Sequence, residues 1–318
     1  MTNSRRSGAI VGGGEAAPDN DGRRGVSVGR GAAASDSDGP VAEAAADAGA
    51  LARLEAELAQ LGSACVAFSG GVDSSLVLAA AVRALGAANV VAYTAVSATY
   101  LPEELAVARD LAAGLGVRHV VAETHEFDQQ AFVENSRGRC YFCKRELVTE
   151  LRRAAEAHGC AALVDGANLD DLGDHRPGMK ASAEAGVRHP LLEAGIGKAE
   201  VRRLARELGL PTWDAPQQAC LASRIPYGSP ITAERLAAVA AAERVLRELG
   251  FRQCRVRHHG DVARVEVEPG DVARAAGEAR EAILAGLHAA GFTYVALDLD
   301  GFRSGSMNEA PSGAAAGR

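Results

Sequence analysis

Aromatic side chains are scarce in this sequence of 318 residues. They make up 4% of it, so the hydrophobic content of 47% depends largely on alanine. No apolar run approaches the roughly 18 residues that a membrane-spanning helix needs. The N-terminal region contains several arginines but lacks the apolar segment of a secretory signal. We therefore expect a soluble, cytoplasmic protein without a membrane partner.

An excess of positive charge is absent as well, because the formal net charge is −7 at pH 7. An acidic chain has no broad electrostatic attraction to nucleic acids or to anionic membrane surfaces. This balance favours a small-molecule substrate over a polynucleotide. A disulfide framework is not expected either, because six cysteines in a long cytoplasmic chain are more typical of free thiols, metal ligands or catalytic groups.

Large apolar side chains are almost missing from residues 1–40, which predicts a disordered tail, and residues 310–318 predict a second one. Between the tails, strands and helices alternate through residues 41–224. This order is typical of an α/β fold whose parallel sheet is covered by helices on both faces. Residues 225–309 are interpreted as a smaller α+β domain.

The hydrophobic pattern predicts individual elements. In the first domain we expect strands at Cys65–Phe68, Asn89–Val96, His119–Ala122 and Ala161–Asp165, and helices at Asp73–Leu85, Pro102–Leu115 and Cys143–Ala157. In the second we expect helices at Thr232–Leu249 and Asp271–Ala289, and strands at Cys254–Arg257, Val262–Val267 and Thr293–Leu299.

A glycine-rich segment, Ser69–Ser75, lies between an expected strand and an expected helix. Its glycines allow a tight turn, and the N–H groups at the helix N-terminus favour an anion such as pyrophosphate. The carboxylate of Asp73 suits Mg²⁺ bridging the phosphates. The segment lacks the Gly-Lys-Ser/Thr ending of a Walker loop. It resembles the PP-loop of the ATP-pyrophosphatase superfamily, which implies cleavage of ATP between the α- and β-phosphates and adenylation of a substrate.

Polar residues also follow the fourth expected strand, at the edge where open α/β sheets bind ligands. Asn168 and Asp171 line the adenylate pocket, with Asp171 as a second candidate Mg²⁺ ligand, or they form a polar turn without a catalytic role. The expected nucleotide-binding residues are Ser69, Gly70, Gly71, Asp73, Ser74, Ser75 and Asn168.

Three cysteines are candidates for metal binding or catalysis. Cys140 and Cys143 form a Cys-x-x-Cys pair just before an expected helix, and Cys220 lies far along the chain. Three thiolates suffice to hold a 4Fe–4S cluster with one iron open to another ligand. Alternatively, Cys220 acts alone as nucleophile or sulfur donor, with Arg224 favouring its thiolate. The cysteine pair is also compatible with a zinc site or with no function.

Longer strings make the chain similar to the LarE family across about residues 45–309. Besides the Ser69–Ser75 loop, they are Arg139–Glu146, Asp165–Asp171, Asp174–Gly178, Ala219–Gly228, Arg255–Gly260 and Leu297–Glu309. The resemblance implies a sulfur transferase that builds the nickel-pincer cofactor of lactate racemase. Its substrate would be pyridinium-3,5-biscarboxylic acid mononucleotide, one carboxylate of which is adenylated before sulfur replaces AMP.

The same resemblance implies two sources of sulfur. One branch of the family gives up the sulfur of its own cysteine, at the position of Cys220. Another branch carries extra cysteines, matched here by Cys140 and Cys143, and holds a 4Fe–4S cluster. Because all three cysteines are present, we expect the cluster branch.

Further residues acquire expected roles from the resemblance. Arg255 and Arg257, at alternate positions of one strand, would bind the substrate phosphate on one face, although a solvated strand face is the alternative. Glu243 resembles an active-site glutamate of the family, although the sequence alone indicates a helix-surface carboxylate. The substrate-binding residues would be Ser223, Arg224, Arg255, Arg257 and Arg176, and the catalytic residues would be Cys220 and Glu243.

Other functions remain possible from the sequence. An RNA 2-thiolation enzyme also couples a PP-loop to cysteines, but it needs a basic surface. An amide-forming ligase of the NAD- or GMP-synthetase type needs an ammonia source, and a nucleotide-binding or iron–sulfur carrier would not catalyse at all. The resemblance further implies a homo-oligomer, assembled through the C-terminal domain, and other nickel-pincer biosynthesis proteins as partners.

Overall fold

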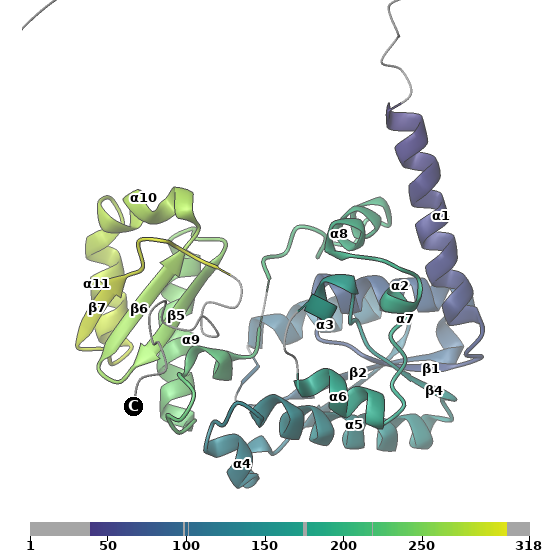
Figure 1. Cartoon of the computed structure of the whole chain (residues 1–318), viewed down its shortest axis with the longest axis horizontal. Coiled ribbons are helices and arrows are strands. Elements are labelled where there is room, and N and C mark those ends of the chain that lie inside the picture. Colours follow the sequence, from purple (N-terminus) through teal and green to yellow (C-terminus); the bar gives the residue numbers. More distant parts are fainter. Residues whose placement is uncertain (1–38, 98, 101, 174–176, 218, 304–318) are drawn as a thin grey trace, which may run out of the picture.

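The structure is a computed structural model that describes residues 39–97, 99–100, 102–173, 177–217 and 219–303 (Figure 1). Its larger sheet has the strand order β3-β2-β1-β4, and each neighbouring pair is parallel. The strands are β1 (Ala64–Ala67), β2 (Val90–Val96), β3 (Arg118–Glu123) and β4 (Ala162–Val164). The predicted α/β class is confirmed, and each of these strands lies close to its predicted position.

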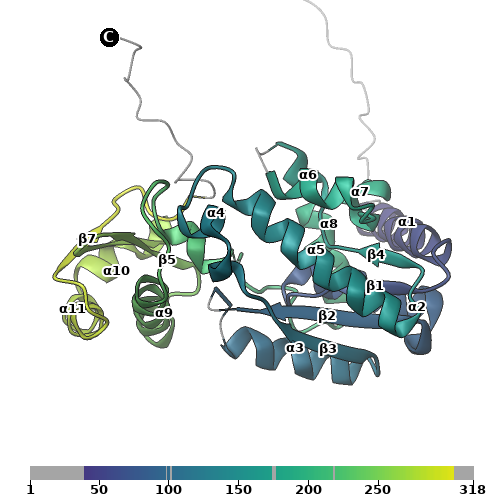
Figure 2. The same ribbon diagram turned by 90° about the horizontal axis from the view of Figure 1, so that it is seen from below.

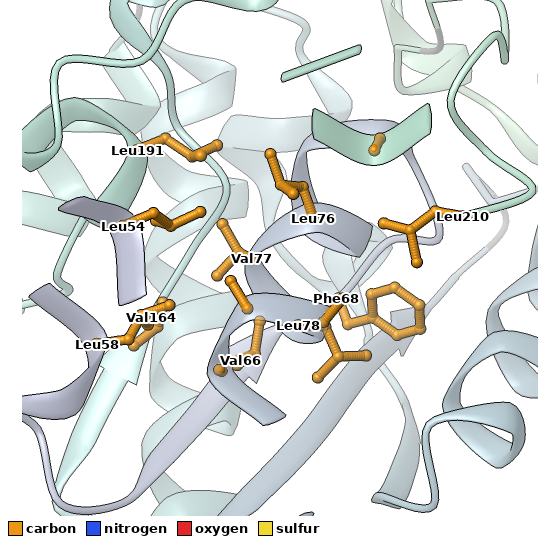
Figure 3. Packing of buried hydrophobic residues seen from close by; sticks show 14 of the residues in the cluster. Leu54, Leu58, Val66, Phe68, Leu76, Val77, Leu78, Val164, Leu191 and Leu210 are labelled. Carbon is orange, nitrogen blue, oxygen red and sulfur yellow. The ribbon is translucent and has the colours of Figure 1, made fainter. Parts of the chain in front are cut away.

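Alternate residues of the central strands supply two cores, one on each face of the sheet. Val66 and Ala92 face a core built with α1 (Gly39–Ala59), α2 (Val72–Leu85), α3 (Pro102–Gly114) and α8 (Lys198–Glu207) (Figure 3). Cys65 and Tyr93 face the opposite core, which is closed by α5 (Arg139–His158) (Figure 2). In open parallel sheets of this kind, ligands bind at the carboxyl ends of the strands.

Shorter elements complete this part of the chain. They are α4 (Gln130–Val133), α6 (Pro177–Glu184), α7 (Pro190–Glu193) and the 3₁₀ turns Ala87–Asn89, Glu126–Asp128, Leu169–Gly173 and Leu221–Arg224. No helix within the described residues is long and apolar enough to span a membrane.

A second, smaller sheet has the order β5-β6-β7. β5 (Cys254–His259) and β6 (Val262–Val267) form an antiparallel hairpin, and β7 (Tyr294–Leu297) pairs parallel to β6. α9 (Ala233–Glu248) packs against it, and Thr232 caps that helix by accepting a hydrogen bond from the Arg235 N–H at 3.3 Å. The hydrophobic core of this second sheet is separate from the two cores of the larger sheet.

Two predicted helices differ from the structure. The helix predicted over Asp271–Ala289 is wrong, because the chain forms a 3₁₀ turn (Pro269–Asp271), α10 (Val272–Ala276) and α11 (Arg280–Ala289). Gly277 has φ −112° and ψ −91°, outside the helical region, and ends α10. The helix predicted from Cys143 begins four residues earlier at Arg139, so the Cys-x-x-Cys pair lies within its first two turns and not before it. The predicted tails fall almost entirely outside the described residues.

Candidate active site

The glycine-rich loop connects β1 to α2 and depends on one particular glycine. Gly70 has φ +76°, and a Cβ at this position would lie 3.2 Å from Ala108 Cβ of α3. Only glycine adopts this backbone so close to a neighbouring helix without strain. α2 then begins at Val72 without a side-chain cap, which leaves its first N–H groups available to a phosphate.

Serine hydroxyls organise the loop internally. Ser74 Oγ accepts from the Ser69 N–H at 3.2 Å and donates to the Gly71 carbonyl at 3.1 Å. Ser69 is exposed, whereas Ser75 is fully buried and its hydroxyl has no hydrogen-bond partner among the described residues. Ser69 and the helix N-terminus therefore present donors to a ligand, while the Ser75 hydroxyl lies inside the protein.

The carboxylate of Asp73 meets residues from two other elements. Asn168 Nδ2 donates to Asp73 Oδ1 at 3.0 Å, and Lys198 Nζ lies 2.5 Å from Asp73 Oδ2. Asp171 Oδ2 accepts from the Asn168 N–H at 3.0 Å. A Cβ on Gly166 would lie 2.8 Å from the Ser74 N atom, so the chain after β4 abuts the loop. The predicted set Asp73, Asn168 and Asp171 is thus brought together beside the helix N-terminus.

Lys198 is a site residue that the sequence analysis missed. It begins α8, more than a hundred positions from the loop, and its backbone N–H also donates to Asp170 Oδ2 at 2.5 Å. The preceding Gly197 allows this close approach, since a Cβ there would lie 3.1 Å from the same oxygen. Lys198 adds a positive charge where a polyphosphate would lie.

The donor set fits ATP with Mg²⁺. Two carboxylates, Asp73 and Asp171, flank Asn168 at the end of a parallel sheet, next to an uncapped helix N-terminus. Mg²⁺ is commonly held by one or two carboxylates together with substrate phosphates. Both carboxylates now accept hydrogen bonds from the protein, so a bound ion would share their oxygens with these donors.

The three singled-out thiols are neighbours. Cys140 and Cys143 are one helical turn apart on α5; Cys140 and Cys220 are exposed, and Cys143 is half-buried. Burial raises the pKa of Cys143, and the nearby thiols of Cys220 and Cys140 raise it further. Desolvation also raises the pKa of Cys220, although the residue as a whole is exposed, whereas Thr99, Ala222 and Arg139 act in the opposite direction.

These thiols do not form a site for one metal ion. Within the part of the chain that the structure describes, no three His, Cys, Asp or Glu side chains are placed to bind a single ion. The thiolates of a 4Fe–4S cluster each bind a different iron, so they need not converge on one point. The neighbourhood of three thiols is therefore compatible with a cluster but does not itself define one.

A short segment connects the thiols to the nucleotide loop. The Thr99 carbonyl accepts from the Leu221 N–H at 3.4 Å, and the Thr99 side chain lowers the pKa of the neighbouring Cys220. The next residue, Tyr100, donates its hydroxyl to the Ser69 carbonyl at 2.7 Å. Two adjacent residues, Thr99 and Tyr100, therefore bridge the Cys220 segment and the glycine-rich loop.

Arg224 and Glu243 form a buried ion pair next to Cys220. Arg224 Nε lies 2.7 Å from Glu243 Oε1, and a second guanidinium nitrogen donates to the Cys220 carbonyl at 3.2 Å. The interpretation of Glu243 as a helix-surface carboxylate is wrong, because only 1% of it is exposed. Burial alone would raise its pKa, but Arg224 and the Val256 N–H outweigh burial and lower it.

Arg255 and Arg257 are buried and face the same segment. Arg257 donates to the Ser223 carbonyl at 3.1 Å, and Arg255 donates to the Gln217 carbonyl. Burial, followed by the charge of Arg224, lowers the pKa of Arg255 to about 10. The expectation that both arginines share one face agrees with these contacts, whereas a solvated strand face does not.

Glu266, which the sequence analysis did not single out, pairs with Arg257. The two Glu266 oxygens lie 3.0 and 2.7 Å from Arg257 nitrogens, and Glu266 is fully buried on β6. The sequence gives no signal for this pairing, because Arg264 and Glu266 alternate with apolar residues in β6 as on an ordinary polar strand face. Arg176, predicted to bind substrate, lies outside the described residues.

A second unpredicted cluster surrounds Asp165 at the end of β4. Its carboxylate lies 2.9 Å from Lys144 Nζ and 2.6 Å from His189 Nδ1. Burial would raise the pKa of Asp165, but Lys144 and His189 lower it well below the usual range. Because Lys144 directly follows Cys143, this cluster anchors the first turns of α5 to the sheet.

Comparisons with known proteins agree with this geometry. A family model described as asparagine synthase matches residues 54–149, which contain the glycine-rich loop and the Cys-x-x-Cys pair. An uncharacterized protein of Synechocystis is 45% identical, with 78% of this chain and 93% of the relative covered. An uncharacterized protein of Methanocaldococcus jannaschii is 31% identical over 54% of this chain and 67% of its own length.

The informative relative comes from Lactiplantibacillus plantarum. It is named pyridinium-3,5-bisthiocarboxylic acid mononucleotide synthase, and it is 41% identical over 81% of this chain and 93% of its own length. Together with the loop geometry and the position of Cys220, this similarity shows that the chain belongs to the LarE family of enzymes.

Proposed function

We propose that this chain adenylates a carboxylate of pyridinium-3,5-biscarboxylic acid mononucleotide with ATP and then replaces AMP by sulfur. The relative from Lactiplantibacillus plantarum, whose name specifies the bisthiocarboxylic acid product, supports this substrate. The observation that carries the proposal is the connection through Thr99 and Tyr100 between the Cys220 segment and the glycine-rich loop, which supports a role for both in one reaction. The product would serve a nickel-pincer cofactor.

The chemistry needs both halves of this site. A carboxylate is a poor acyl donor, so its oxygen first attacks the α-phosphorus of ATP and pyrophosphate leaves. A sulfur nucleophile then attacks the carbonyl carbon and AMP leaves. The N-terminus of α2, Ser69 and Lys198 would stabilise the charge on the phosphates, and Mg²⁺ held by Asp73 and Asp171 would supply further neutralisation.

The buried arginines would orient the substrate. Arg255 and Arg257 contact the Cys220 segment and would direct the substrate phosphate toward it, with Ser223 and Arg224 shaping the same pocket. Glu243 would hold Arg224 in place and keep it charged. Arg176 is proposed as an additional substrate contact.

The source of sulfur distinguishes two versions of the proposal. A 4Fe–4S cluster held by Cys140, Cys143 and Cys220 would supply sulfide at the iron without a protein ligand. In the other version Cys220 transfers its own sulfur and becomes dehydroalanine. We favour the first because the three thiols are neighbours.

Two measurements test these proposals. With ATP and the pyridinium substrate, the enzyme should release pyrophosphate only when the substrate is present and should form its thiocarboxylate. Protein purified without oxygen should contain roughly four irons per chain, lost in Cys140→Ala, Cys143→Ala and Cys220→Ala. Iron-free protein that converts substrate once, while Cys220 loses the mass of H₂S, would refute the cluster version.

The alternatives have weaker support. An RNA 2-thiolation enzyme is disfavoured by the net charge of −7, and retention on tRNA at physiological salt would revive it. Pyrophosphate release that depends on ammonia would instead favour an amide-forming ligase. We also propose that the chain forms a homo-oligomer through residues 225–309, which light scattering of the purified protein would test.

A further inference from the structure

A single buried side chain, Asn135, joins the two segments that carry the thiols. Asn135 lies between α4 and α5, is completely buried, and has φ +55°, the only positive value of a non-glycine residue within the described part of the chain. This left-handed conformation is uncommon outside glycine. A polar residue buried in such a conformation is stabilised by the contacts that its side chain makes.

All polar atoms of the Asn135 side chain are used. Its Nδ2 donates to the carbonyl oxygens of Pro226 at 2.8 Å, Ser229 at 2.9 Å and Ile225 at 3.2 Å. Its Oδ1 accepts a hydrogen bond from Arg139, which directly precedes Cys140. The acceptors all belong to the loop 225–231, which follows the Cys220–Arg224 segment.

Neighbouring contacts attach the same loop to the segment that runs from the end of α4 to the start of α5. The Gly228 N–H donates to the Asn135 carbonyl at 3.1 Å, and the Ile231 N–H donates to the Val133 carbonyl at 2.9 Å. The Arg139 guanidinium lies 5.1 Å from the centre of the Tyr227 ring. The start of α5 is thus fixed to the chain that leads from the first sheet into α9.

We propose that Asn135 is a positioning residue of the thiol site. It holds the Cys220 segment against the first turn of α5, so that Cys220 stays beside Cys140 and Cys143. This inference deepens the proposed function, because it rests on that function for the use of the thiols. The juxtaposition itself is testable without substrate or ATP.

Dibromobimane, which becomes fluorescent when it links two nearby thiols, measures this juxtaposition. In a Cys143→Ser chain it reports the pair Cys140 and Cys220, and in a Cys220→Ser chain it reports the pair Cys140 and Cys143. The chain with all three replaced by serine gives the background from the remaining cysteines. The test variant is Asn135→Gly, since glycine tolerates the positive φ and only the side chain is lost.

We expect Asn135→Gly to slow linkage of Cys140 to Cys220 by about tenfold or more, because the hydrogen bonds to the Ile225, Pro226 and Ser229 carbonyls disappear. Linkage of Cys140 to Cys143 should not change, since both residues lie on α5. An unchanged rate for the first pair, or an equal fall for both pairs, would overturn the proposal.

A second variant covers the case in which Asn135→Gly does not fold. Asn135→Asp keeps the shape and tolerates the left-handed backbone, but it cannot donate to the three carbonyls. In the Cys143→Ser chain it should show the same selective loss, and linkage of Cys140 to Cys220 at an unchanged rate in this variant would also overturn the proposal. A wild-type chain that links its thiols but makes no thiocarboxylate would refute the proposed function and leave the positioning role intact.

Discussion

At the residue scale, the site contains charged side chains that are buried and paired. Arg224 with Glu243, and Arg257 with Glu266, present guanidinium groups to the Cys220 segment while their charge is balanced behind it. Removing one partner of such a pair costs far more than removing an exposed pair, because the other charge remains buried. The carboxylates therefore fix the positions of the two guanidinium groups.

Replacing Glu243 tests this arrangement. We expect Glu243→Gln to lower the free energy of unfolding by about 3 kcal/mol, because Arg224 keeps its charge without a carboxylate. Chemical denaturation measures the change. The control is Glu150→Gln, which removes the exposed pair with Arg153 and should cost no more than about 1 kcal/mol. Equal effects of the two variants would contradict the buried pairing.

A different prediction concerns the contribution of Lys198 to catalysis. Lys198→Ala should lower substrate-dependent pyrophosphate release by about 100-fold, because it removes a positive charge from the phosphate site. The control is Lys180→Ala, whose side chain is 75% exposed on α6. The rate of pyrophosphate release by both variants is the measurement. A wild-type rate for Lys198→Ala would exclude the proposed role.

His189 predicts a dependence of stability on pH. Its hydrogen bond with Asp165 raises its pKa above 6.5 against the opposing effect of burial, while Lys144 and Glu193 also face it. The stabilisation by this pair is therefore complete below pH 6.5, and it is lost as the pH rises through the pKa of His189 in the folded state. The difference in unfolding free energy between wild type and His189→Gln should be larger near about pH 5.5 than near about pH 9. A difference independent of pH would show that His189 does not titrate with Asp165.

At the element scale, the glycine-rich turn depends on its contact with α3. Gly70→Ala should destabilise the protein by about 1–2 kcal/mol, because its φ of +76° and the 3.2 Å approach to Ala108 both exclude a methyl group. Gly71→Ala is the control, since its backbone is extended and a Cβ would lie 3.4 Å from Ser69 Oγ. Thermal melts should give a lower melting temperature for Gly70→Ala than for Gly71→Ala. Similar melting temperatures would show that α3 moves away and makes room for the added methyl group.

The parallel strands could be predicted from the sequence because each is a short apolar run bounded by turn residues. The ends of the helices were harder to predict from the sequence. Nothing in the hydrophobic pattern distinguishes the first turn of α5 from the loop before it, since Arg139 and Cys140 face partners that only the fold supplies. The break at Gly277 was missed because an isolated glycine is also tolerated inside helices.

At the scale of the whole molecule, the site combines residues from both sheets. Local motifs predicted Asp73, Asn168 and Cys220, because each lies in a short recognisable string. Lys198 and Asn135 could not be predicted in this way, since their roles arise from contacts across the fold. Glu266 becomes visible only when the β5–β6 hairpin places it beside Arg257.

The central claim is that one site couples adenylation by the glycine-rich loop to sulfur transfer at Cys220. The most direct measurement follows pyrophosphate and thiocarboxylate in the same reaction for wild type and Cys220→Ala. We predict that Cys220→Ala still releases pyrophosphate when the pyridinium substrate is present but forms no thiocarboxylate. Thiocarboxylate formed by Cys220→Ala at the wild-type rate would contradict the account.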